Sequence, residues 1–269
     1  MRCAIASPVR NVGAYLENVL LNVDALCSIF DDTVVLFYYD KSTDNTWDTL
    51  VKYQDRSRHP VFLLGHDDAA SSLSSLRTVR IASARNALLQ TVEMWFADFD
   101  FIVMMDGDDR CSEPIDLNLV RQNLCRNDWD ALSFNRPGYY DAWALLYHPF
   151  VHNCWGFGND SLKMISLMRN DITEKLRVLP ENELYPCYSA FNGFSIYRLH
   201  MFKGCRYYGR PKSYFSQSEM NDLRNFMRQN GIGAMSDPEE MCEHHSFHLD
   251  AVRTRQARIR ISPHYLFQC

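Results

Sequence analysis

The first part of the chain alternates short apolar runs with longer segments whose apolar residues recur at helical spacing. Four runs have the length of buried strands: residues 3–9, 33–40, 61–64 and 101–105. Three segments between them carry apolar side chains on one helical face: residues 15–26, 44–53 and 77–96. This alternation predicts an α/β fold with a mostly parallel sheet and helices on both of its faces.

The second part of the chain is less regular and richer in aromatic residues, which gather at 139–157 and 185–197. One amphipathic helix is predicted at residues 219–229, with Gly231 just beyond its end. No Pro/Gly/Ser-rich linker separates the two parts, so we expect a single domain over residues 1–269. Within it, residues 1–110 are expected to form a nucleotide-binding half, and residues 111–269 an acceptor- or sugar-binding half.

Composition narrows the class of protein. With 269 residues, 46% of them hydrophobic, the chain can bury a large core without stabilising disulfides or metal ions. Its 28 Lys+Arg against 33 Asp+Glu give a net charge of −5, which argues against a general nucleic-acid binder. The apolar runs are too short to span a bilayer, and the N-terminus is strand-like rather than a signal peptide. Nine cysteines without a C-x-x-C pair favour reduced thiols over a disulfide framework or zinc cage. We therefore expect a soluble, cytoplasmic protein with no integral membrane segment.

The most informative segment is Asp106-Gly107-Asp108-Asp109, which directly follows the predicted strand at 101–105. Carboxylates crowded at a strand tip repel one another, and a divalent cation relieves that repulsion. Carboxylate oxygens suit Mg²⁺ and Mn²⁺, which bind one or two protein carboxylates together with substrate phosphates. The alternative is a solvated acidic turn with Gly107 in a left-handed conformation.

Two further polar segments follow predicted strands. Asp40, Ser42 and Asp44 come after the strand at 33–40, and Pro8 and Arg10 come at the end of the first strand. The carboxyl ends of parallel strands meet at one edge of a sheet, where ligands bind. Alternatively, the first group only caps the next helix and Arg10 is an ordinary surface residue.

Together these segments resemble the nucleotide-sugar-dependent glycosyltransferases of the GT-A (Rossmann-like) fold. The resemblance lies in P-x-R-N after the first strand, D-x-S-x-D-x-T after the second and D-x-D after a later one. It implies that the following residues bind the nucleotide-sugar donor: Pro8, Arg10, Asp40, Ser42, Asp44, Arg85 and Asp106. It implies a metal site, for Mn²⁺ or Mg²⁺, at Asp106, Asp108 and Asp109.

Later segments resemble the capsule-associated mannosyltransferases and related glycosyltransferases of large DNA viruses. These segments are Tyr140 to Leu145, Phe191 to Arg198 and Cys242 to His248. That subfamily commonly has Arg after its D-x-W-x-L run, where this chain has Leu146. If the protein is viral, its cytoplasmic compartment is that of the host.

The histidines of the last segment are candidate metal ligands. An imidazole from His245 or His248 can complete the coordination that the D-x-D carboxylates begin, and surface histidines are the alternative.

Inverting enzymes of this fold use a carboxylate as general base, often in a Glu-Asp pair near a late helix. Here Glu219 and Asp222 match that pattern, but Met220 replaces the second acid of the pair. Glu219 is then either the base, or the enzyme retains anomeric configuration and needs no such base. A third possibility is that both acids only favour the positive end of a helix.

We therefore predict a metal-dependent hexosyl- or pentosyltransferase that moves a sugar from a UDP- or GDP-sugar to a hydroxyl of a glycan or glycoconjugate. The main alternative is an inactive sugar-nucleotide- or carbohydrate-binding module. A phosphotransferase using Asp106 as nucleophile is disfavoured, because Arg110 stands where that chemistry usually has Thr or Val. A membrane-surface role rests only on a late run of arginines: Arg253, Arg255, Arg258 and Arg260.

Overall fold

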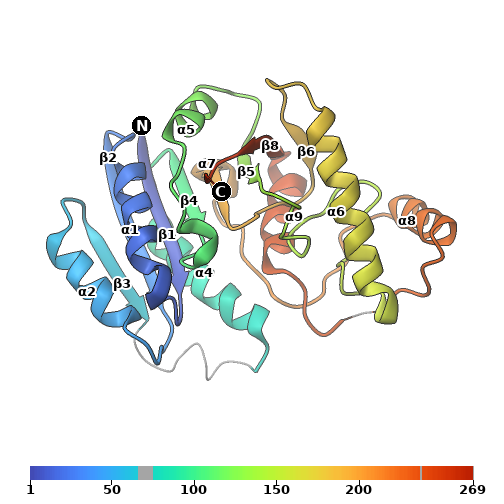
Figure 1. Cartoon of the computed structure of the whole chain (residues 1–269), viewed down its shortest axis with the longest axis horizontal. Helices are drawn as coiled ribbons and strands as arrows, with labels where there is room; N and C mark the ends of the chain where they lie inside the picture. The colour runs from blue at the N-terminus through green and yellow to red at the C-terminus, as the bar shows by residue number, and fades with distance from the viewer. Residues whose placement is uncertain (66–74, 237, 269) are drawn as a thin grey trace.

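The described residues form one eight-stranded mixed sheet, with the strand order β3-β2-β1-β4-β7-β5-β8-β6 (Figure 1). The computed structural model describes residues 1–65, 75–236 and 238–268. The strands are β1 (Arg2–Val9), β2 (Asp32–Tyr39), β3 (Val61–Gly65), β4 (Phe101–Met105), β5 (Ala131–Asn135), β6 (Tyr185–Cys187), β7 (Phe194–Arg198) and β8 (Ile259–Tyr265). The four strands predicted in the first part of the chain are confirmed, each within one residue of its expected bounds.

Strand direction changes where the second part of the chain joins the sheet. Strands β3, β2, β1 and β4 are parallel to one another. Strand β7 then runs antiparallel to both β4 and β5, and β6 runs antiparallel to β8 at the edge. The prediction of an α/β fold with a mostly parallel mixed sheet flanked by helices is confirmed.

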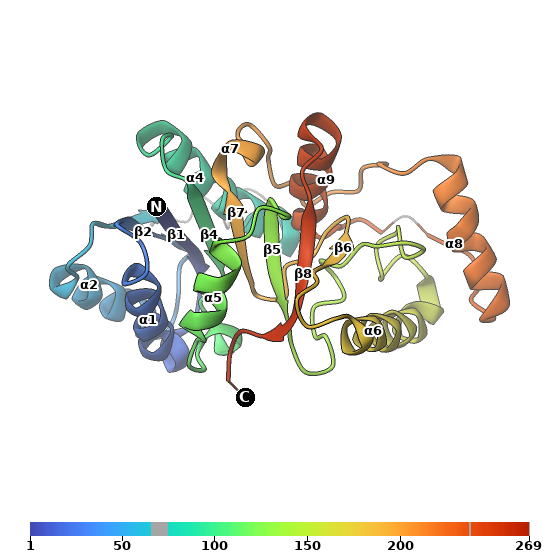
Figure 2. The ribbon, with the colours of Figure 1, turned by 90° about the horizontal axis from the view of Figure 1, so that it is seen from above.

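Helices cover both faces of the sheet (Figure 2). On one face lie α1 (Gly13–Cys27), α2 (Thr46–Arg56) and α5 (Leu117–Leu124). On the other lie α4 (Arg77–Trp95), α7 (Leu199–Phe202) and α9 (Glu243–Arg255). Alternate side chains of the same strands enter the two cores, so that Ile5 packs with the α1 layer and Ala4 with the α4 layer. The sheet is therefore buried on both faces, as its parallel strands require.

A third apolar cluster lies at the β6 end of the sheet. There α6 (Ser161–Val178) and α8 (Gln217–Gln229) pack with the aromatic segment around Tyr147 and Phe150. Helix α8 ends where the sequence predicts, and Gly231 beyond it has a φ of +59°, a conformation that glycine adopts without strain. Among the helices of the described residues, none is long and apolar enough to cross a membrane.

Candidate active site

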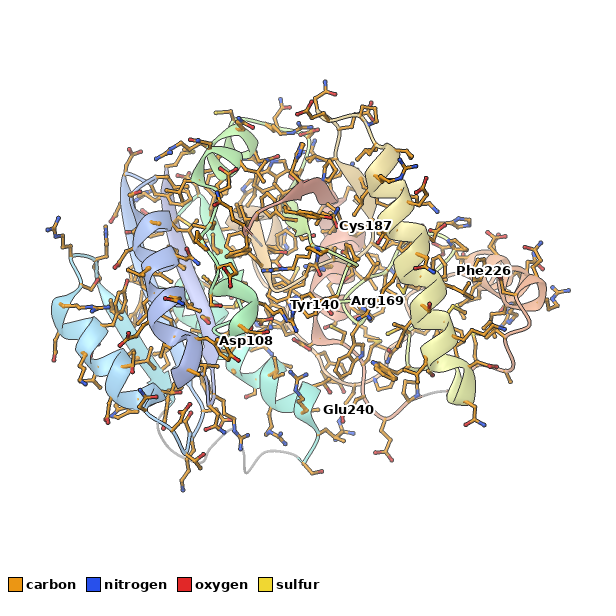
Figure 3. All side chains as sticks on the ribbon, in the orientation of Figure 1. Asp108, Tyr140, Arg169, Cys187, Phe226 and Glu240 are labelled. Carbon is orange, nitrogen blue, oxygen red and sulfur yellow. The ribbon has the colours of Figure 1, made fainter. Side chains whose placement is uncertain are left out.

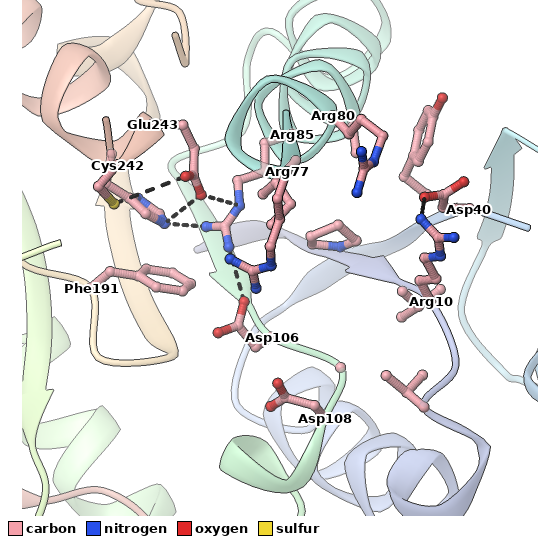
Figure 4. Close-up of a pocket in the computed structure, with 18 of the residues that line it drawn as sticks. Arg10, Asp40, Arg77, Arg80, Arg85, Asp106, Asp108, Phe191, Cys242 and Glu243 are labelled. Carbon is pink, nitrogen blue, oxygen red and sulfur yellow. Dashed lines mark hydrogen bonds and ion pairs between the residues drawn. The ribbon is translucent and has the colours of Figure 1, made fainter. Parts of the chain in front are cut away.

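The carboxyl ends of β1, β2 and β4 border a cavity of about 430 Å³ (Figure 4). Parallel pairing aligns these ends, since Val9 is the partner of Tyr39 and Ala6 the partner of Met104. Helix α4 and the start of α9 form the opposite wall. Six of the residues predicted to bind donor or metal line this cavity: Pro8, Arg10, Asp40, Arg85, Asp106 and Asp108. Its volume is in the range of small-molecule sites.

The turn after β4 directs the side chains of Asp106 and Asp108 toward the cavity (Figure 4). The backbone N–H of Asp106 donates to the carbonyl of Gly193 at 2.8 Å, and Asp108 accepts from the N–H of Arg110 at 3.0 Å. Gly107 is not among the glycines of the described chain with positive φ, so the left-handed turn considered above is wrong. Position 107 requires glycine because the backbone there passes close to Val9: an added Cβ would lie 2.5 Å from a methyl carbon of Val9.

Arg85 is the central cation of the site. It is buried on α4, and its guanidinium lies 2.9 Å from Asp106 and 3.3 Å from Glu243. It also contacts the His244 ring and lies over the ring of Phe191, 4.5 Å from its centroid. Burial alone would lower the pKa of Arg85, but the two carboxylates raise it, so the guanidinium stays charged. Arg85 therefore fixes the orientation of Asp106 and ties α4 to α9.

Three carboxylates of the cavity, those of Asp106, Asp108 and Asp141, hold protons more tightly than ordinary carboxyl groups. Burial raises the pKa of Asp106 to about 7, a shift that Arg85 opposes and the charge of Asp108 increases. Burial also raises the pKa of Asp108 and of Asp141, another carboxylate of the cavity wall. A bound cation would stabilise the ionised forms of these groups.

The pKa of Asp106 predicts a pH dependence of stability in metal-free buffer. Its value in the folded chain, about 7, exceeds its ordinary value of 3.8, so between these pH values the native state binds more protons than the unfolded state. The contribution of Asp106 should therefore make the free energy of unfolding fall as pH rises from about 4 to 7, by up to about 1.4 kcal/mol per pH unit. Urea denaturation across this range should show a shallower fall for Asp106→Asn than for the wild type. Equal slopes for the two proteins would contradict the raised pKa.

The D-x-S-x-D segment divides between the cavity and a neighbouring loop. Asp40 lines the cavity and forms an ion pair with Arg10 at 3.1 Å. Ser42 accepts from the N–H of Asn11 at 2.9 Å, and Asp44 accepts from the N–H of Gly13 at 2.8 Å. Ser42 and Asp44 thus hold the turn between β1 and α1, and they do not belong to the cavity lining.

The predicted histidine ligands lie in α9 and away from the cavity lining. His248 is fully buried and hydrogen-bonds Ser189 at 2.9 Å and Tyr197 at 3.0 Å. His245 faces a separate cavity beside Tyr214. Burial lowers the pKa of both histidines to about 3, so they are neutral near pH 7. It is His244 that lines the site, where its ring stacks on Phe191 at 3.9 Å.

The third acid of the D-G-D-D segment, Asp109, also lies off the cavity lining. It is half-exposed and pairs with Arg110 at 3.5 Å. Within residues 1–65, 75–236 and 238–268, no group of three or more His, Cys, Asp or Glu side chains converges on a common metal position. The structure therefore brings together two acids of the predicted metal site, Asp106 and Asp108, in one cavity.

The two acids predicted for catalysis lie on α8, at the end of the molecule. Figure 3 shows this separation through its labels for Phe226, on α8, and Asp108. Glu219 accepts from the N–H of Ser216 at 2.8 Å while Ser216 accepts from the N–H of Glu219, which forms a capping box. Asp222 lies 3.1 Å from the ring of His148. Neither acid lines the cavity that contains Asp106.

Several cavity residues were not expected from the sequence. They are Arg77, Arg80, Asp141 and Glu243. The two arginines were detectable in principle, because a predicted helix over 77–96 places Arg77 and Arg80, three residues apart, on one face. Asp141 and Glu243 lie in two segments that carry the family resemblance, Tyr140 to Leu145 and Cys242 to His248, but only the tertiary fold brings them to β4.

No protein-family model matches the chain, and no curated protein matches it. Solved structures of similar arrangement include S. aureus TarS, at 13% identity and a TM-score of 0.49 over 99% of this chain and 36% of TarS. Another is the mannosyltransferase PcManGT from Pyrobaculum calidifontis in complex with GDP-Man and Mn²⁺. It has 14% identity and a TM-score of 0.45 over 88% of this chain and 55% of the mannosyltransferase. A third is the Mycobacterium tuberculosis glucosyl-3-phosphoglycerate synthase with Mn²⁺ and UDP. It has 14% identity and a TM-score of 0.38 over 87% of this chain and 68% of the synthase.

This chain spans about a third of TarS and about half of the mannosyltransferase. At these scores and identities the likeness carries no information about activity.

Proposed function

We propose that the protein is a metal-dependent glycosyltransferase of the GT-A type, which moves a sugar from a UDP- or GDP-sugar to a hydroxyl group of a glycan or glycoconjugate. The observation that carries the proposal is the position of Asp106 and Asp108. They lie in a cavity at the carboxyl ends of parallel strands, the edge at which nucleotides bind in open α/β sheets. The cavity also contains Asp40, which directly follows β2.

The residues of the cavity fit a divalent cation. Asp106 and Asp108 offer hard oxygen ligands, and Asp108 has no ion pair among the described residues that would compete. Mg²⁺ and Mn²⁺ are commonly held by one or two carboxylates, with phosphate oxygens and water in the remaining positions. Such an ion supplies charge neutralisation for the departing diphosphate.

In this proposal the other cavity residues bind the nucleotide part of the donor or orient the residues that do. Asp40 can accept hydrogen bonds from the hydroxyl groups of a nucleoside, and Arg10 holds its carboxylate in place at 3.1 Å. Arg77 and Arg80 bring positive charge from α4 to the cavity wall, where a diphosphate would meet it (Figure 4). Arg85 acts through Asp106 and is therefore a positioning residue in this proposal.

The proposal predicts ligand-specific thermal stabilisation. UDP-, GDP- and dTDP-sugars should be compared by thermal shift, each with and without Mn²⁺. At least one UDP- or GDP-sugar should raise the melting temperature, and more so with Mn²⁺, because a ligand at 100 times its Kd stabilises the native state by about 2.7 kcal/mol. Hydrolysis of that donor in the same buffer then separates an enzyme from a binding module. A chain that none of these ligands stabilises, with or without Mn²⁺, would contradict the proposal.

A further inference from the structure

The cavity beside Tyr214, called the Tyr214 cavity below, is separate from the one that contains Asp106. Its volume is about 510 Å³, within the range of small-molecule sites, and it is lined by α8, α9 and residues 211–215. Along α9, Glu243 lines the Asp106 cavity and His245 lines the Tyr214 cavity. Residues two apart point to different sides of a helix, so the two cavities lie against different faces of the start of α9.

One wall of the Tyr214 cavity is apolar. The four buried residues of a small hydrophobic cluster all line it: Leu146, Tyr214, Met241 and Leu249. Phe215, which packs against this cluster, and Met220 of α8 extend the same surface. The wall can therefore cover the apolar part of a ligand.

Two side chains of this wall stand where the chain departs from the glycosyltransferases that it resembles. Leu146 occupies a position where Arg is common, and Met220 occupies the position of the second acid of the Glu-Asp pair. At both positions an apolar side chain replaces a charged one, and both side chains line the Tyr214 cavity. The apolar wall is thus a feature of this chain that the resemblance does not imply.

The Lys, Arg, Asp and Glu side chains that line the Tyr214 cavity, within the described residues, are two cations, Lys212 and Arg224. Lys212 pairs with Asp250 at 3.2 Å. Arg224 donates to the side-chain oxygen of Asn221 at 2.9 Å and forms no ion pair with another described residue. Gln217 donates to the same oxygen at 3.0 Å, so Asn221 holds both polar side chains along α8. Arg224 is therefore the cation that can meet a ligand.

The acids of α8 do not neutralise this charge. Glu219 caps the helix through Ser216, and Asp222 lies 3.1 Å from the ring of His148. Neither carboxylate lines the Tyr214 cavity. The cavity thus combines an apolar wall with a cationic rim.

We propose that the Tyr214 cavity binds a small amphipathic anion, whose apolar part packs on the wall formed by Leu146 and Met220 and whose negative group contacts Arg224. Arginine forms charge-assisted hydrogen bonds with phosphate and carboxylate groups, and the apolar wall excludes water from the rest of the ligand. This inference goes beyond the proposed function and does not depend on it. The residues proposed to bind donor and metal are absent from the lining of this cavity.

The probe for this site is naphthyl phosphate, which joins an aromatic group to a phosphate. Calorimetry in metal-free buffer without nucleotide compares it with inorganic phosphate, which lacks the apolar part, and with naphthalenemethanol, which lacks the charge. Each of these two compounds should bind at least about tenfold more weakly than the probe, because each meets only half of the site.

Arg224→Gln should weaken binding of naphthyl phosphate about tenfold, since a charge-assisted hydrogen bond is lost. Arg228→Gln is the matched control. Arg228 lies on the same helix and also donates to the asparagine three residues before it, Asn225 at 2.5 Å, but it does not line the Tyr214 cavity. Its replacement should leave the affinity within about twofold of the wild type.

A second pair of variants tests the charge of the cavity at one position. Met220→Glu places a carboxylate among the lining residues and should weaken binding of naphthyl phosphate by at least about tenfold, because like charges repel. Met220→Gln has nearly the same shape without the charge and should stay within about threefold of the wild type. Urea denaturation checks that each variant is folded, and the two arginine variants decide the matter if Met220→Glu is not.

Several results would overturn the proposal. One is the absence of saturable binding of naphthyl phosphate to the wild type at concentrations up to about 1 mM, which corresponds to about 4 kcal/mol. Others are equal affinities for naphthyl phosphate and naphthalenemethanol, or equal losses in Arg224→Gln and Arg228→Gln. A loss in Arg77→Gln with none in Arg224→Gln would place the probe in the Asp106 cavity instead. None of these results bears on nucleotide binding, which is measured separately.

Discussion

Replacing Arg85 with methionine should lower the free energy of unfolding by about 3–5 kcal/mol, the usual cost of removing one partner of a buried ion pair. Methionine retains most of the side-chain volume, so the change removes mainly charge and hydrogen bonds. It leaves Asp106 and Glu243 facing each other without the guanidinium that lies 2.9 Å and 3.3 Å from them. Urea denaturation at pH 7 in metal-free buffer measures the loss.

A more exposed arginine provides the matched control. Arg206 pairs with Glu93 at 2.6 Å, but its side chain is 38% exposed, against 5% for Arg85. Arg206→Met should therefore cost about 1 kcal/mol or less. Adding Glu243→Gln to Arg85→Met should restore part of the stability, because one unpaired buried charge is removed. Similar losses for Arg85→Met and Arg206→Met would show that burial does not strengthen the Arg85 network.

The strands and helices of the first part of the chain were predictable because their patterns are local. Strand β4 is an uninterrupted apolar run that stops at Asp106, and α4 has a helical apolar face. Strands that alternate with helices pair in parallel, which brings their carboxyl ends to one edge of the sheet. The cavity could therefore be expected at Asp40 and Asp106, which directly follow β2 and β4. Local pattern does not fix the antiparallel insertion of β7, since its pairing joins Met105 to Phe194, far apart in sequence.

Sequence spacing does not show which polar residues face the cavity and which have a structural role elsewhere in the fold. Glu219 has the position of a catalytic acid in the sequence, yet the structure uses its carboxylate to cap α8. His248 satisfies its ring nitrogens through Ser189 and Tyr197 in the core. Asp141 lines the cavity and accepts a hydrogen bond from the backbone of Asn192, 51 residues away in sequence, a contact that local pattern does not predict.

Replacing Asp108 with asparagine should weaken Mn²⁺-dependent binding of UDP or GDP by at least about 100-fold, since a charged metal ligand is exchanged for a neutral one. Calorimetry at fixed nucleotide concentration with increasing Mn²⁺ measures this loss. The fold should not suffer in metal-free buffer, because burial already raises the pKa of Asp108 and disfavours its charge. Urea denaturation of the variant should therefore give an unfolding free energy no lower than that of the wild type.

Asp109 provides the sharpest comparison, because it is the adjacent acid of the same segment and the sequence does not distinguish the two. Its carboxylate is 46% exposed, pairs with Arg110 and lies off the cavity lining, whereas Asp108 lines the cavity. Asp109→Asn should therefore change the Mn²⁺ dependence much less than Asp108→Asn, about threefold or less. The reverse order, with Mn²⁺ dependence lost in Asp109→Asn and kept in Asp108→Asn, would move the proposed metal site out of the cavity and away from the carboxyl end of β4.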